Sequence, residues 1–96
     1  MNYLITPRGE RQEAAPKDGV AFTVTELQDM VGGWIDIKEI GDNHLVVFDV
    51  DGARKDKLYN KTATELIRKA WVSEDGEPWN SFVAGNAVIC TQIRVD

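Results

Sequence analysis

The chain has 96 residues, enough for one domain with a hydrophobic core, and we expect residues 1–96 to form that single domain. Eleven basic and sixteen acidic residues give a net charge of −5, which argues against general nucleic-acid binding because phosphate attraction needs clustered positive charge. No apolar run approaches the ~20 residues of a membrane helix, and the N-terminal residues lack the features of a secretory signal. Because Cys90 is the one cysteine, no internal disulfide can form, and a cytoplasmic location is expected.

The N-terminal residues predict two short strands. Residues 2–6 read as an opening strand, and residues 7–9 contain the proline and glycine of a turn. Residues 10–19 are polar and predict a weak edge strand that runs into a loop.

A first helix is predicted from Thr25 onward. Thr25 and Gln28 have the spacing of a capping box, in which each side chain satisfies a backbone amide of the first turn. Gly32 is suited to end the helix because glycine readily adopts the left-handed conformation. The apolar face of this helix consists of Leu27, Met30 and Val31.

The centre of the sequence predicts three consecutive strands. Residues 34–40 alternate between apolar and polar, and residues 41–43 form a turn. Residues 45–50 are apolar on both faces, which predicts a central strand covered on both sides. The aspartate and glycine at 51–52 are a hairpin signal, and a polar return strand is expected at 53–58.

The second helix and the last strand complete the predicted fold. Thr62 and Glu65 form a second capping box ahead of an apolar stripe, and residues 73–80 are a loop before a strand at 87–95. Short connections favour an α+β fold, with a mostly antiparallel sheet of about five or six strands and two short helices packed on it. The stripe consists of Ala63, Leu66, Ile67, Ala70 and Trp71.

Basic residues are concentrated in one segment, which is a candidate anion site. Residues 54–69 carry a net charge of +4, whereas the other 80 residues carry −9. The free amides of a helix that starts near Thr62 would attract a phosphate group. The residues expected at this site are Lys55, Lys57, Asn60, Lys61 and Thr62. The alternative is a solvated edge strand with ordinary surface lysines.

Three tryptophans are candidates for a protein contact. Trp71 ends the apolar stripe and is expected in the core, and Trp34 could be core or a surface anchor. Trp79 lies in a loop and is the tryptophan that we expect to be most exposed, although it could instead cover the edge of the core.

No residue set in the sequence indicates catalysis, a metal or a cofactor. Residues 45–53 resemble the first motif of haloacid-dehalogenase-type phosphatases, with Asp49 and Asp51 as its two carboxylates, but the rest of that parallel domain is missing and a turn explains the pattern better. An EF-hand also lacks its remaining ligands. His44 stands alone, and Cys90 is expected to be a buried, inert thiol.

The order of short motifs resembles a family of small domains encoded by phages, plasmids and bacterial chromosomes. Its hallmark, L-Q-x-x-V-G-G followed by an aromatic residue and isoleucine, stands at 27–35. The further motifs stand at 49–52, 60–64 and 83–89. Asp49 replaces a frequent asparagine, and the loop at 73–80 is longer than usual. This family has no established activity, so the resemblance implies a fold unit and an association with mobile elements but no mechanism.

The sequence therefore predicts a small, non-enzymatic accessory module that binds a macromolecule, most simply a protein, through the basic segment and Trp79. The alternative is a binder of a nucleotide or phosphorylated metabolite at the start of the second helix. A third hypothesis, that the acidic remainder mimics nucleic acid, has less support from a net charge of only −5. The oligomeric state is left open.

Overall fold

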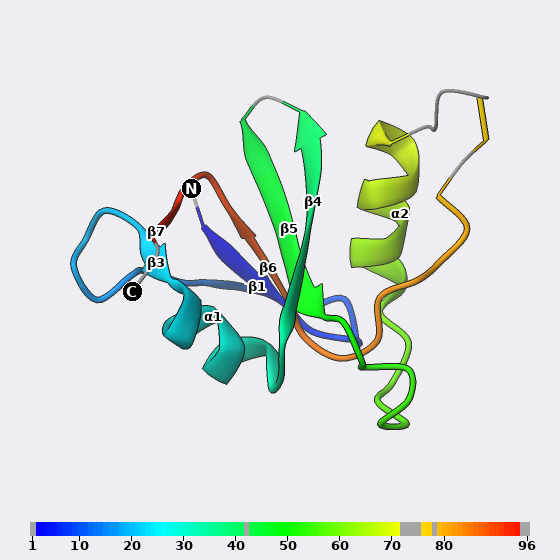
Figure 1. Ribbon diagram of the computed structural model, residues 1–96, viewed down its shortest axis with the longest axis horizontal. Coiled ribbons are helices and arrows are strands. Elements are labelled where there is room, and N and C mark those ends of the chain that lie inside the picture. The colour runs from blue at the N-terminus through cyan, green and yellow to red at the C-terminus, as the bar shows by residue number, and fades with distance from the viewer. Residues whose placement is uncertain (1, 42, 72–75, 78, 95–96) are drawn as a thin grey trace.

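Figure 1 shows a computed structural model of the chain, in which residues 2–41, 43–71, 76–77 and 79–94 are described. Its main element is a five-stranded antiparallel sheet with the strand order β2-β1-β6-β5-β4, and β3 and β7 form a separate two-stranded parallel sheet. This arrangement, with two helices, is the α+β fold expected from the sequence. The strands are β1 (Tyr3–Ile5), β2 (Arg11–Glu13), β3 (Phe22–Thr23), β4 (Ile35–Gly41), β5 (His44–Asp49), β6 (Ala87–Cys90) and β7 (Ile93–Arg94).

The two helices, α1 (Val24–Val31) and α2 (Lys61–Ala70), lie on opposite faces of the five-stranded sheet (Figure 1). Side chains of a strand alternate between the two faces, so β5 contributes to two separate clusters of apolar residues. Val46 and Phe48 pack in the cluster that contains Ile67 of α2, whereas Val47 packs in the cluster that contains Leu27 of α1. The expectation of a central strand covered on both faces is therefore confirmed.

Helix α1 begins two residues earlier than the sequence analysis predicted. Thr23, not Thr25, is the N-cap, and its hydroxyl accepts a hydrogen bond from the amide of Glu26 at 3.1 Å. The Glu26 carboxylate accepts the Thr23 amide in return at 3.1 Å, because glutamate at this position completes the capping box. At the other end, Gly32 adopts the predicted left-handed conformation, with φ of 82°.

Helix α2 also begins earlier than predicted, because Asn60 rather than Thr62 is its N-cap. The Asn60 side-chain oxygen accepts the amide of Ala63 at 3.0 Å, which leaves Thr62 inside the first turn. Ala63 and Ile67 of the predicted stripe are buried, and Leu66 and Trp71 pack at the margin of the same core. Ala70, the fourth position of the stripe, is instead exposed.

Two strand predictions were wrong in the second half of the chain. Residues 53–58 form turns rather than a return strand, because the lysines in this segment turn back toward the end of β5. The predicted strand at 87–95 is interrupted after Cys90, so that β6 pairs with β5 while β7 pairs with β3. Residue 42 of the predicted turn, half of the predicted loop at 73–80 (residues 73–75 and 78) and Val95 lie outside the described residues. No described helix is long and apolar enough to cross a membrane.

Candidate functional site

A buried carboxylate lies where β5 ends, and two lysines bind it. The Asp49 side chain is fully shielded from solvent, and its Oδ2 atom is 2.9 Å from Lys55 Nζ and 2.7 Å from Lys57 Nζ. Its Oδ1 atom accepts the amide of Asp51 at 2.9 Å. A buried charge requires such partners, since leaving it unpaired is costly. We call Asp49, Lys55 and Lys57 the Asp49 cluster.

The same two lysines also bind the C-terminal end of α1. Lys57 Nζ donates to the carbonyl oxygens of Val31 and Gly32 at 2.7 and 3.3 Å, and Lys55 Nζ donates to that of Gly32 at 3.2 Å. The last turn of α1 has no basic residue of its own. Because the free carbonyls at a helix C-terminus carry partial negative charge, lysines from the turn after β5 supply the favourable cation.

These contacts determine the protonation state of Asp49. Burial by itself raises the pKa of this carboxyl group, but the hydrogen bonds from Lys57, Lys55 and the Asp51 amide outweigh that effect. The net result is a pKa below the ordinary value of 3.8. Asp49 is therefore an anion at neutral pH, and the Asp49 cluster carries one excess positive charge next to the end of α1.

Glycines make room for the Asp49 cluster. A Cβ atom added to Gly33 would meet Lys55 Nζ and would lie 2.7 Å from Asp49 Oδ2. A Cβ atom at Gly32 would lie 2.8 Å from Lys57 Nζ, and one at Gly85 would lie 2.7 Å from Lys57 Cδ. The Gly-Gly pair after α1 therefore has a packing role in addition to ending the helix.

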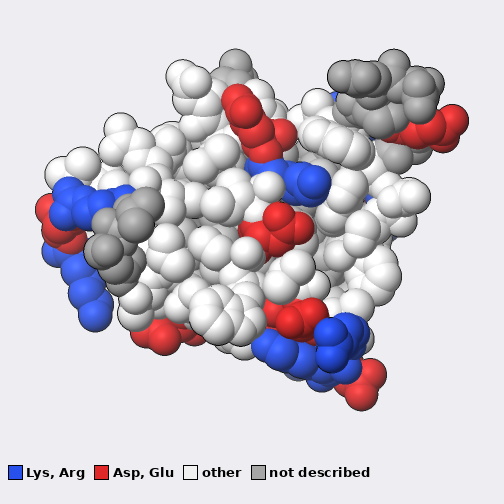
Figure 2. All heavy atoms as spheres, in the orientation of Figure 1, with Lys and Arg blue, Asp and Glu red and all other residues white. Residues whose placement is uncertain are grey.

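The predicted positive stripe is partly neutralised in the structure. Lys55 and Lys57 are turned to Asp49, and Arg54 lies 3.5 Å from the Asp51 carboxylate. Figure 2 shows the result at its lower right, where acidic and basic groups are intermixed. The expected edge strand is absent because the segment folds as a turn around the buried carboxylate, although Arg54 and Lys55 are exposed to solvent.

The anion site predicted at the start of α2 is not assembled. Asn60 is completely buried, and its side-chain amide donates to the carbonyl oxygens of Ile5 and Gly85 at 3.0 and 2.9 Å. Its side-chain oxygen already accepts a hydrogen bond from the Ala63 amide in the first turn. Lys61 is exposed and Thr62 is half-buried in the first turn, while the ammonium groups of Lys55 and Lys57 point elsewhere.

The exposed tryptophan is Trp34, not Trp79. Trp79 is only 7% exposed and packs edge-on against Phe48, with their ring centroids 5.9 Å apart. Trp71 is half-buried, with Lys38 Nζ 4.9 Å from the centre of its ring. Trp34 is 70% exposed at the turn between α1 and β4. Its position directly after Gly32 and Gly33 was the signal in the sequence, since a tight turn leaves little side-chain cover.

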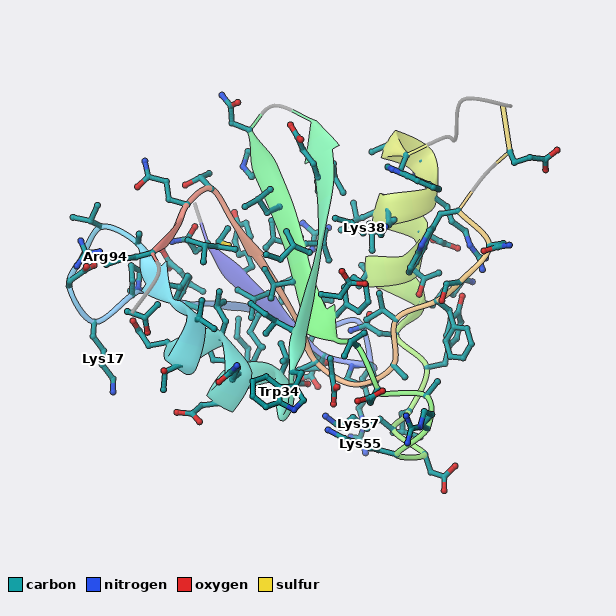
Figure 3. All side chains as sticks on the ribbon, in the orientation of Figure 1. Lys17, Trp34, Lys38, Lys55, Lys57 and Arg94 are labelled. Carbon is teal, nitrogen blue, oxygen red and sulfur yellow. The ribbon has the colours of Figure 1, made fainter. Side chains whose placement is uncertain are left out.

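Trp34 borders a shallow depression next to the Asp49 cluster. The depression has a volume of about 440 Å³, and Figure 3 shows Trp34 near Lys55 and Lys57 at the end of the molecule where β4 begins. A second depression, of about 480 Å³, lies along the other side of Gly32 and reaches Lys57 and Leu58. Besides Trp34, the first depression is lined by Gln28, Asp29, Gly32, Gly33 and Lys55.

Comparison with protein-family models, curated proteins and solved structures found no match. The resemblance noted in the sequence therefore stays a prediction. The structure nevertheless brings residues of its separate motifs together. Gly32 and Gly33 of the first motif and Asp49 of the second meet at the Asp49 cluster, and Asn60 of the third binds the carbonyl of Gly85 in the fourth.

The remaining chemical candidates lie apart from this surface. Cys90 is buried in β6, and burial raises the pKa of its thiol to about 11, so the thiol stays protonated at neutral pH. Among the described residues, no three histidine, cysteine, aspartate or glutamate side chains are grouped closely enough to hold a metal ion. His44 begins β5 as a half-buried residue.

Proposed function

We propose that the chain is a non-enzymatic module that binds another protein, and that Trp34 is the anchor of its binding surface. The observation that carries this proposal is the 70% exposure of a tryptophan on a well-braced turn. Because a tryptophan side chain carries a large apolar area, a partner that covers Trp34 would gain much binding energy. Tryptophan is among the residues most enriched at the centre of protein interfaces, where its burial supplies much of the binding energy.

The backbone around Trp34 is held from three sides. The Trp34 carbonyl accepts the amide of Val50 at 2.9 Å, and the Gly33 amide donates to the Gln28 carbonyl at 3.1 Å. Behind the turn, Lys55 bridges the Gly32 carbonyl and Asp49. A side chain presented by such a fixed backbone loses little conformational entropy on binding, which favours an interaction surface.

The depression beside Trp34 adds polar groups to an apolar anchor. Asp29 and Lys55 bring opposite charges, and Gln28 brings an amide that can donate and accept hydrogen bonds. Protein interfaces commonly combine a buried aromatic centre with a polar rim of this kind. An accessory role also agrees with the resemblance to small domains of mobile elements, which we include in the proposal.

Affinity capture from a bacterial lysate tests this proposal, with variants first shown to be folded like the wild type. We expect proteins that the wild-type chain enriches to be lost with Trp34→Ala and retained with Leu58→Ala. Leu58 is the matched control because it is also strongly exposed, at 68%, but lies next to the other depression. Identical enrichment with wild type and Trp34→Ala would contradict the assignment of Trp34, and so would loss with Leu58→Ala alone.

A further inference from the structure

Strand β4 forms a long free edge of the five-stranded sheet. It lies at one end of the strand order and has seven residues, whereas β2 at the other end has three. In Figure 1, β4 runs down the middle of the view, in front of β5. Edge strands usually carry features that prevent pairing, such as shortness, proline, charged side chains or a bulge. Strand β4 is neither short nor interrupted by proline, but it carries Asp36, Lys38 and Glu39, and its register shifts between Glu39 and Gly41.

The pairing of β4 with β5 determines which backbone groups face outward. Trp34 is opposite Val50 in this register, and its carbonyl accepts the Val50 amide. Hydrogen-bonded and non-hydrogen-bonded pairs alternate along an antiparallel ladder. Ile35, Ile37 and Glu39 therefore direct their amides and carbonyls away from β5, toward the free edge.

The middle residue of this set confirms the outward direction. The amide of Ile37 donates to the neighbouring side-chain oxygen Asp36 Oδ1, at 2.8 Å, instead of to a strand. The Ile37 side chain is 41% exposed, although Ile35 on the same face of the strand packs against the core. The backbone of Ile37 thus faces the free edge, and in a paired strand its amide would exchange the Asp36 carboxylate for a carbonyl oxygen of the other copy.

We propose that two copies of the chain pair through β4, antiparallel and around a two-fold axis at Ile37. In this register Ile37 of each copy is opposite the other, and they exchange two backbone hydrogen bonds. Asp36 of each copy is opposite Lys38 of the other, in the non-hydrogen-bonded pairs where side chains come closest. Two symmetric ion pairs therefore form on the face that carries α2. In the same register Trp34 of each copy is opposite Ile40 of the other, so the dimer interface reaches the residue proposed above as the protein-binding anchor.

Charge complementarity selects this register over its neighbours. Moving the axis by one residue places Asp36 opposite Asp36 or Lys38 opposite Lys38, and like charges in directly opposed positions are destabilising. Moving it by two residues places Asp36 opposite Trp34, or Lys38 opposite Ile40, so that no opposite charges meet. In Figure 2 a basic group lies between acidic groups along the line of β4.

Charge reversal with measurement of mass in solution tests the dimer. We expect the wild-type chain to have about twice its mass of 10.7 kDa in sedimentation or light-scattering experiments. Asp36→Lys and Lys38→Asp should each be monomeric, because each creates two like-charged pairs. An equimolar mixture of the two variants should form a dimer, since every opposed pair is then complementary. The double variant should also recover the dimer.

Matched charge changes on α2 distinguish loss of the dimer through the Asp36–Lys38 pairs from a general effect of net charge. Glu65→Lys and Lys69→Asp alter the same charges at exposed positions and should remain dimeric. Recovery on mixing could not arise from variants that fail to fold. A wild-type chain that stays monomeric up to about 1 mM would overturn the proposal, as would single variants that remain dimeric.

A cysteine placed on the axis tests the register itself. Opposed residues in a hydrogen-bonded pair have Cα atoms about 5.5 Å apart, within the range that a disulfide spans. Under oxidising conditions Ile37→Cys should therefore form a covalent dimer, whereas Glu39→Cys, opposite Ile35, should form much less. Equal cross-linking of the two variants would contradict an axis at Ile37.

Discussion

At the scale of single residues, Asp49 organises the end of the molecule that carries Trp34. Its carboxylate is buried and receives two lysines, which also neutralise the C-terminal carbonyls of α1. The two lysines are not equivalent. The side chain of Lys57 is 25% exposed and donates to three acceptors, whereas that of Lys55 is 43% exposed and donates to two.

Replacing these lysines should separate their contributions to stability. We expect Lys57→Met to lower the free energy of unfolding by about 2–3 kcal/mol, because it leaves the Val31 carbonyl without its lysine donor and removes the shorter of the two lysine contacts of Asp49 Oδ2. Lys55→Met should cost about 1 kcal/mol or less, since water can reach its partners. Urea unfolding of both variants measures the difference. Equal losses would mean that the contacts of Lys57 are no stronger than those of Lys55.

The protonation of Asp49 predicts a dependence of stability on pH. Its pKa in the folded state lies below the ordinary value of 3.8, so its contribution is fully present above that pH and is lost as the pH falls through the folded-state value. The wild type should therefore unfold at a higher temperature than Asp49→Asn at neutral pH, and the gap should close in acid. A gap that stays constant from neutral pH to below pH 3.8 would contradict the cited pKa shift.

At the scale of elements, Asn60 joins three segments. Its side chain caps α2, donates to β1 through the Ile5 carbonyl, and donates to the Gly85 carbonyl ahead of β6. Asn60→Ala should lower the free energy of unfolding by about 3 kcal/mol, because two buried carbonyls and one helix amide lose their partner. Thr62→Ala should cost less than about 0.5 kcal/mol, as expected of an ordinary first-turn position. Thermal or urea unfolding of the two variants measures these losses. A larger loss for Thr62→Ala than for Asn60→Ala would mean that Thr62 is the cap.

Sequence periodicity predicted most elements. The capping-box spacing failed at the start of α1, where two threonines could each be the N-cap. The alternation in β4 and the apolar run of β5 determine strands directly, and Gly32 ends α1 as expected. The start of α1 was placed at Thr25 although Thr23 and Glu26 form a capping box with the same spacing. A spacing rule alone cannot decide between two overlapping boxes, because packing against the sheet determines which first turn forms.

At the scale of the whole molecule, the site depends on contacts that local patterns do not contain. Lys57 and Val31 are separated by 26 positions in the sequence, so no short motif indicates that they touch. The burial of Trp79 likewise depends on Phe48 from a distant strand. The sequence signal for this site was indirect. It consisted of an aspartate at the end of an apolar strand, two nearby lysines, and a glycine pair whose lack of side chains leaves space for the lysines.

Contacts between distant segments are also the reason why the sequence could not predict which surface is open to a partner. The basic segment has a net positive charge in the sequence, but in the folded chain the carboxylates of Asp49 and Asp51 lie beside its lysines and Arg54. Trp34, which the sequence left open, is the exposed tryptophan, and Trp79 covers the core beside Phe48 as in the alternative given for it. Two surfaces remain for partners, the Trp34 depression and the edge of β4, and each has its own test.

The affinity of a captured protein for purified variants tests the central claim most directly. With a partner recovered by the wild-type chain, the dissociation constant should rise about 30-fold or more for Trp34→Ala, which corresponds to about 2 kcal/mol and is typical of an interface hot spot. Leu58→Ala should leave it within a factor of about two, because isolated surface substitutions have small effects. An unchanged dissociation constant for Trp34→Ala would contradict the proposal that this turn presents the binding anchor.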